Sequence, residues 1–289
     1  MKKILRITLS LFLVMILTVN LFNVQAVTVS EEDWISKALS DYEPLQSMLE
    51  QYPNAEKVQS NIKYVLTETI KDKDGEILNI TQKNFDNLSK MQNYEEQLVE
   101  INNITPYVVG DGETKYKTYT KMRVGLALYK YNSNRFFVAF VYDWLTQPDY
   151  DALLKYKGVV GLALDSGLSM DGTSYAGRVT MKIIDGSTIM RNTQNGGVNI
   201  KATGTQGIGY KIEESAQNTG LILEMEGVIS CEAIKTSSNI IATSAFGEYA
   251  YVGFTPNLNS FSVSFPKGVS FGIGTTKTPY TYQDALDLR

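Results

Sequence analysis

The residue types present in this chain limit its chemistry before any spacing is considered. The chain contains no histidine and a single cysteine, Cys231. Without histidine, Ser-His-Asp catalysis, Cys-His catalysis and histidine-ligated zinc are excluded. The hydrolytic chemistry that remains needs two carboxylates with unequal pKa values, as in glycan hydrolysis. A catalytic role would therefore have to rest on a pair of acidic side chains.

Some acidic residues lie beside aromatic ones, a setting in which a glycosidase can raise a carboxyl pKa and stack a sugar. These acids are Asp143 in the run YDW, Asp149 and Asp151 on either side of Tyr150, and Glu248 before Tyr249. The sequence ties no second carboxylate to Asp143, and a carboxylate at a strand end often caps the next turn. We therefore assign no catalytic residue and favour a non-catalytic protein.

We predict instead that aromatic side chains near strand ends form a binding surface. Tyrosine is abundant, with 18 residues, and exposed tyrosine or tryptophan provides a large contact at low entropic cost. Tyrosine is also an ordinary strand residue, so its abundance alone does not define a site. The predicted ligand-binding residues are Asp143, Trp144, Tyr249, Tyr251 and Tyr282.

An oxygen-rich segment at residues 165–173, DSGLSMDGT, provides the one metal alternative. Asp165 and Asp171 stand six residues apart with hydroxyl groups and carbonyls between them, and such a segment could surround Ca²⁺. Asp-Ser-Gly and Asp-Gly are also common turn sequences, so a plain turn is the competing interpretation. Apart from calcium at this segment, we expect no cofactor.

These side chains must be positioned by β structure, and we place its centre at residues 136–145, FFVAFVYDWL. Apolar residues occupy both parities of this run, with Phe136 and Phe140 on one and Phe137 and Val141 on the other. A strand that is apolar on both parities is covered on both faces. The run is therefore predicted to be a central strand.

Residues 221–233 instead alternate between an apolar and a polar parity. Cys231 lies on the apolar parity and is predicted to point into the core. The polar parity, predicted to face water, contains Glu224, Glu226, Ser230 and Glu232.

The rest of the chain predicts a mainly β fold with an N-terminal helical segment. Amphipathic helices are predicted over residues 30–52, interrupted at Pro44, and over residues 84–103, with a hairpin at 62–80 between them. We expect an antiparallel β-sandwich or jelly-roll-like body at 107–289, with the region 27–106 packed on it. Residues 278–289 are predicted to form a polar tail.

The first residues indicate export. Lys2, Lys3 and Arg6 precede an apolar run that ends in a cleavage-like VQA, so we predict a signal peptide at residues 1–26. A retained membrane anchor is the alternative. Removal of this segment leaves 24 of the 27 basic residues against all 31 acidic ones, a net charge of −7. Such an acidic chain is a poor partner for nucleic acid or anionic lipid.

The sequence thus predicts a secreted or extracytoplasmic, non-catalytic β-sandwich protein that binds a surface glycan or protein. One alternative is a membrane-active or pore-forming protein, because the Ser/Thr/Gly-rich alternation at 196–213 and 260–278 could rearrange into an amphipathic hairpin. A carboxylate-dependent glycan hydrolase is the other alternative. The ligand and the oligomeric state are left open.

Overall fold

The computed structural model describes residues 31–72, 77–102, 116–146, 157–213, 222–238, 243–252, 258–264, 268–273 and 280–288. The predicted signal peptide lies outside these residues. The helices are α2 (Glu31–Leu39), α3 (Glu43–Gln51) and α4 (Leu88–Asn102). The strands are β1 (Glu56–Lys71), β2 (Ile77–Phe85), β3 (Tyr116–Lys130), β4 (Arg135–Trp144), β5 (Lys157–Leu164), β6 (Leu168–Ile183), β7 (Thr188–Asn192), β8 (Val198–Gly204), β9 (Gly207–Glu213), β10 (Ile222–Lys235), β11 (Thr243–Val252), β12 (Leu258–Ser264), β13 (Gly268–Ile273) and β14 (Tyr280–Leu288).

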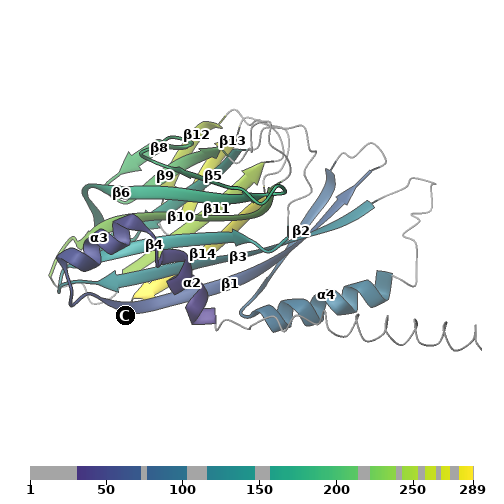
Figure 1. Cartoon of the computed structure of the whole chain (residues 1–289), viewed down its shortest axis with the longest axis horizontal. Coiled ribbons are helices and arrows are strands. Elements are labelled where there is room, and N and C mark those ends of the chain that lie inside the picture. The colour runs from purple at the N-terminus through teal and green to yellow at the C-terminus, as the bar shows by residue number, and fades with distance from the viewer. Residues whose placement is uncertain are drawn as a thin grey trace, which may run out of the picture.

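The strands form two antiparallel sheets and a separate hairpin (Figure 1). The seven-stranded sheet has the order β2-β1-β3-β4-β10-β6-β7, and the five-stranded sheet has the order β14-β11-β5-β9-β8. Apolar side chains from both sheets share one core, so the sheets pack face to face as a sandwich. The predicted antiparallel β-sandwich is therefore confirmed.

Strand β4 is the fourth of the seven strands, and its two faces are buried in two different cores. Phe136 and Phe140 face the five-stranded sheet in the sandwich core. Phe137 and Val141 belong to a second core, together with side chains of α2 and α3. The prediction of a central strand covered on both faces is confirmed, and the helices supply the second cover.

All three described helices cover the outer face of the seven-stranded sheet, the face that points away from the sandwich core. Helix α4 packs on Tyr64 and Leu66 of β1, whereas α2 lies close to β3. A Cβ at Gly125 of β3 would come within 2.8 Å of Ile35 Cδ1 in α2. Glycine at this position therefore permits the close approach of helix and strand.

The helical layer corrects part of the prediction for β10. Cys231 is buried in the sandwich core, as predicted. Its neighbour Ser230, predicted to face water, is also buried and shares a 2.9 Å hydrogen bond with the Tyr42 hydroxyl at the start of α3. A register shift between Ile222 and Glu224 turns Leu223 outward, although Leu223 shares the parity of Cys231, which is predicted to face the core. Beyond this shift, the alternation of side chains correctly separated the two faces of β10, but it did not predict that the helices cover the outer face.

The structure also differs from the predictions for the N-terminal hairpin and for the end of the chain. The predicted hairpin of the N-terminal region forms β1 and β2, and β1 pairs along its length with β3, so the hairpin is part of the large sheet. The prediction of a polar tail at the end of the chain is wrong, because Tyr280–Leu288 forms β14 and pairs with β11.

In the described part of the chain, no helix combines the length and the apolar character needed to cross a membrane.

Replacing Phe140 tests the importance of the doubly covered strand. Phe140 is fully buried, so Phe140→Ala is expected to lower the free energy of unfolding by about 3–5 kcal/mol. A Cβ at Gly247 of β11 would overlap the Phe140 ring, so Gly247→Ala alone also destabilises. In the Phe140→Ala background, the added methyl occupies part of the cavity and restores some stability. Denaturant melts of the four proteins measure this coupling, and simple additivity of the two losses would contradict the packing described here.

Cys231 is expected to resist thiol reagents in the folded protein. Burial raises the pKa of its thiol to about 12, and both its accessibility and its thiolate fraction are low. A chromogenic disulfide reagent should label it only after denaturation. Rapid labelling of the native chain would show that β10 faces the other way.

Candidate functional site

One row of residues crosses the outer face of the seven-stranded sheet beside α2. The strand registers place Arg123 of β3 opposite Asp143 of β4, and Asp143 opposite Glu226 of β10. The row continues through Thr180 of β6 to Met190 of β7. Residues paired in this way across antiparallel strands point to the same face, so the row places two carboxylates side by side.

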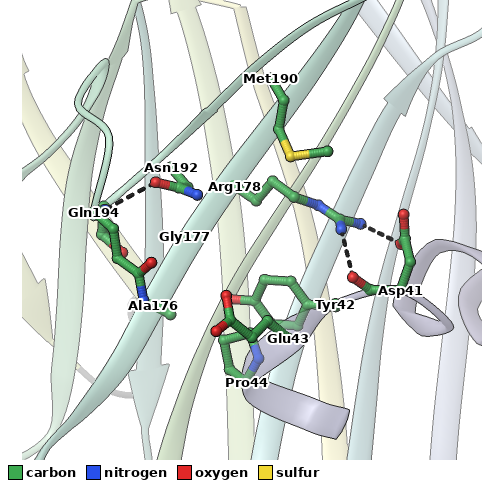
Figure 2. A pocket seen from close by; sticks show the side chains of 11 residues that line it. Asp41, Tyr42, Glu43, Pro44, Ala176, Gly177, Arg178, Met190, Asn192 and Gln194 are labelled. Carbon is green, nitrogen blue, oxygen red and sulfur yellow. Dashed lines mark hydrogen bonds and ion pairs between the residues drawn. The ribbon is translucent and has the colours of Figure 1, made fainter. Parts of the chain in front are cut away.

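Helix α2 covers only part of this row and leaves a groove of about 630 Å³ between the helix and β7. We call it the α2–β7 groove. Its lining combines acidic, basic and apolar side chains: Trp34, Lys37, Ala38, Ser40 and Asp41 from α2 and its C-terminal turn, and Arg123, Asp143, Arg178, Thr180, Lys182, Thr188, Met190, Glu224, Met225 and Glu226 from the sheet. A smaller pocket of about 120 Å³ adjoins it (Figure 2) and shares Asp41, Arg178 and Met190 with it.

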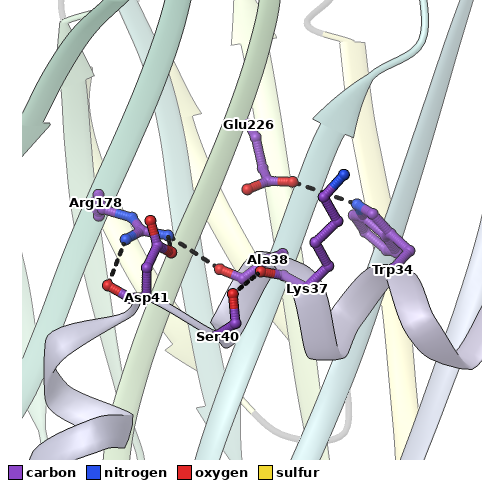
Figure 3. A network of polar contacts seen from close by, with 7 residues as sticks. All are labelled: Trp34, Lys37, Ala38, Ser40, Asp41, Arg178 and Glu226. Atoms are coloured by element: carbon purple, nitrogen blue, oxygen red, sulfur yellow. Dashed lines mark hydrogen bonds and ion pairs between the residues drawn. The ribbon is translucent and has the colours of Figure 1, made fainter.

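Arg178 of β6 fixes the C-terminal end of α2 at this groove. Its guanidinium donates hydrogen bonds to the carbonyl oxygens of Ala38 and Asp41, both at 3.0 Å, and to Asp41 Oδ1 at 2.9 Å (Figures 2 and 3). The last carbonyls of a helix have no partner within the helix and carry partial negative charge, so a buried arginine satisfies them well. Arg178 therefore positions the wall of the groove.

A second set of polar contacts fixes the other end of α2. The indole Nε1 of Trp34 donates to Glu226 Oε2 at 3.4 Å (Figure 3). The Arg123 guanidinium lies 4.3 Å from the centre of the Trp34 ring and donates to Asp143 Oδ2 from Nε at 2.8 Å and from Nη2 at 2.6 Å. Each carboxylate of the row therefore has a defined donor.

The two carboxyl groups are harder to ionise than ordinary acids. Burial raises the pKa of Asp143 to about 6, although the Arg123 guanidinium acts in the opposite direction. Burial also raises the pKa of Glu226, and the hydrogen bond from Trp34 opposes that shift. Neighbouring acids with raised pKa values resemble the pair that acid–base hydrolysis needs. Here Arg123 engages the Asp143 carboxylate and lies against the Trp34 ring, so this ring is not free to stack a sugar beside the acids.

Of the residues predicted to bind a ligand, Asp143 lies in the groove. Trp144 and Tyr249 do not, because both are buried in the sandwich core. Tyr249 stacks on Tyr142 with ring centres 4.3 Å apart, and Trp144 meets Tyr249 edge-on at 5.8 Å. The prediction that these two rings contact a ligand is corrected, since packing between the sheets removes them from the surface.

The other predicted residues stay untested. Tyr251 and Tyr282 lie in β11 and β14, with their side chains outside the described residues, as are Asp149 and Asp151 entirely. Glu248 is buried, on the opposite parity of β11 from Tyr249.

The predicted calcium segment at 165–173 is not a continuous loop. Residues 166–167 form a turn, and β6 begins at Leu168. Asp171 pairs with Arg135 at 3.0 Å, and Asp165 accepts a hydrogen bond from the Ser166 hydroxyl. Within the described residues, no group of three or more acidic, cysteine or histidine side chains could hold a metal ion. The turn interpretation fits this segment, and calcium binding there stays an untested prediction.

Sequence reasoning missed Trp34, Arg123, Arg178 and Glu226. Arg123, Arg178 and Glu226 each lie in the middle of a strand, on the side whose residues are mostly polar. Such a side normally faces water. A charged residue at mid-strand is the available signal, and other charged residues share these strands. It becomes specific only when the strand register and the position of α2 are known.

Comparisons with known proteins give a likeness of shape only. No protein family matches the chain, and no curated protein matches it. The collagen-binding subdomain of the Enterococcus faecalis surface protein ACE matches with 8% identity and a TM-score of 0.31, over 53% of this chain and 87% of that one. The T6 backbone pilin of Streptococcus pyogenes matches with 11% identity and a TM-score of 0.32, over 80% and 64%. A pore forming protein matches with 6% identity and a TM-score of 0.28, over 58% and 86%. Likenesses at this level assign no function.

The raised pKa values predict a pH dependence of stability. An acid whose pKa is higher in the folded than in the unfolded chain stabilises the fold when protonated, and this contribution is lost as the pH rises through the folded value, about 6 for Asp143. The Asp143 contribution to the melting temperature is therefore expected to increase when the pH is lowered from about 7 to about 5. Asp143→Asn removes this titration and should give a flatter pH profile by calorimetry. Parallel profiles for the two proteins would contradict the raised pKa.

Proposed function

We propose that this chain is an exported, non-catalytic binding protein that holds a segment of another protein in the α2–β7 groove. The observation that carries the proposal is the groove itself, a concave site with charges of both signs and exposed apolar side chains around it. Sites of this shape on a rigid sheet are typical ligand sites.

The apolar contribution comes from three side chains at the β6–β7–β10 part of the sheet. Among the described residues, the exposed large hydrophobic side chains are Val58, Leu78, Ile184, Met190 and Leu223. Met190 lines the groove, Ile184 directly follows β6, and Leu223 precedes the groove residue Glu224. Exposed apolar side chains gathered near one concave site favour a protein contact.

The polar contribution favours a protein segment over a glycan. Lys182 and Glu224 form an ion pair of 3.0 Å with both side chains largely exposed, so a partner can exchange with either charge at little cost. A glycan site would need an exposed aromatic ring, whereas Trp34 is 4% exposed and its ring is in contact with Arg123. A peptide with one apolar anchor and charges of both signs matches this lining best.

The membrane-active alternative has less support. The stretch 196–213 contributes β8 and β9 to the five-stranded sheet, so its rearrangement would break the β5–β9 and β8–β9 ladders. The stretch 260–278 includes β13 and most of β12, which pair with each other outside both sheets. The alternative therefore rests on that hairpin alone.

The groove is tested by selecting peptides from a displayed random library against the chain from residue 27 onward. Met190→Asp places a charge among the apolar contacts and is expected to weaken selected peptides about tenfold or more. Lys182→Glu reverses a groove charge and should alter which charged peptides bind. Lys90→Glu is the matched control, because Lys90 is an exposed, ion-paired lysine on α4, away from the groove.

Peptides that bind all three variants equally would refute the groove as the site. Selective binding of arrayed glycans, with no peptide selected, would refute a peptide as the ligand. The same three variants would then show whether the glycan binds in the groove.

A further inference from the structure

In the described part of the chain, the seven-stranded sheet ends at β2 in an edge that pairs with no further strand, far from the groove. Among the described strands, β2 pairs only with β1. Figure 1 shows β2 and α4 at one end of the molecule, with α3 at the other. Residues 78–84 of β2 are exposed, except for the half-buried Ile80. An edge strand of this length offers a row of backbone donors and acceptors to another strand.

Proteins usually protect such an edge, and the other end of this sheet shows how. The edge strand β7 is five residues long, and the chain turns back beside it to form an isolated bridge between Asn192 and Gly197. Gly197 adopts a φ of 84°, a conformation that glycine tolerates. Strand β2 has nine residues, no proline, and no register shift from Asn79 to Phe85.

The one charge on β2 does not protect its edge. Lys83 is the only charged residue of the strand, and its Nζ lies 3.6 Å from the centre of the Tyr94 ring on α4. This cation–π contact holds the ammonium over the helical face of the sheet instead of beyond the strand edge. Within the described residues, an approaching strand therefore meets neutral side chains and unpaired backbone groups.

We propose that β2 is a homodimer interface, in which β2 of a second copy pairs antiparallel with it about a two-fold axis at Thr81. The sequence of the strand, ILNITQKNF, is self-complementary in this register. Thr81 faces its own counterpart, Ile77 faces Phe85 of the other copy, and Lys83 faces Asn79. No like charges stand opposite each other, which is a requirement for stable cross-strand pairs. The two Lys83 residues are about 13 Å apart along the strands.

The geometry of this pair is compatible with the helices. A two-fold axis that relates antiparallel strands of one sheet is perpendicular to the sheet, so both copies present the same face on the same side. The α4 helices of the two copies then lie on one face of a continuous sheet, and neither helix blocks the β2 edge, because α4 packs on the face of β1 and β2.

The charge at position 79 tests this register directly. Asn79→Lys places a lysine opposite Lys83 twice in each dimer, and Asn79→Glu places a glutamate there. Asn79→Lys should weaken the dimer about tenfold, and Asn79→Glu should tighten it severalfold at low salt. Sedimentation of the chain from residue 27 onward measures the dissociation constants. Both variants change one exposed side chain, so equal thermal melts are expected and would verify folding.

Cross-linking provides a readout that does not depend on charge. Thr81→Cys brings two thiols opposite each other at the axis, and a short bismaleimide should join them efficiently. Asn84→Cys is the control, because its two thiols would be about 20 Å apart along the strands. The native Cys231 is buried and should not react. Equal cross-linking at the two positions, a monomeric wild type, or equal responses to lysine and glutamate at position 79 would each overturn the proposal. None of these outcomes concerns peptide binding at the groove.

Discussion

The need to bury both faces of β4 is the constraint on which the rest of the structure depends. An isolated sheet can leave one face in water, but exposing apolar side chains of this strand to water on either face costs free energy. Phe137 and Val141 lie on one face, and Phe136 and Phe140 on the other. The five-stranded sheet covers the inner face, and α2 and α3 cover the outer one. The molecule is therefore layered, with helices on a sheet that is packed on a second sheet.

The groove follows from a mismatch in width between these layers. Helices α2 and α3 cover the centre of the outer face, while the sheet continues past them to β6 and β7. The contacts that hold α2 in place, from Arg178 at its C-terminal end and Glu226 near Trp34, also form the groove lining. The side chains that dock the helix therefore also line the groove, so a ligand that contacts them would stabilise the N-terminal helices as well.

The two ends of the large sheet suit different partners. The β7 end is short, protected at its edge and adjoins the groove, whereas the β2 end is long and, among the described strands, paired on one side only. Pairing through β2 would place two grooves on the same face of one continuous sheet, at its two outer ends. A surface that repeats the recognised segment could then be bound twice by one dimer, and the second contact would form at a high effective concentration.

The sequence by itself determined the mainly antiparallel β fold, the central position of 136–145 and the inward direction of Cys231. These conclusions rest on the alternation of side chains along a strand, which is a local property of the chain. The residues lining the groove were decided by tertiary structure. Asp143 and Glu226 are 83 positions apart in the sequence, and only the β4–β10 register brings them together. The same register, with α2 laid over it, buries Ser230, whereas Trp144 and Tyr249 are buried by the facing sheet. Local alternation states which residues share a face, but the cover on that face comes from segments remote in sequence.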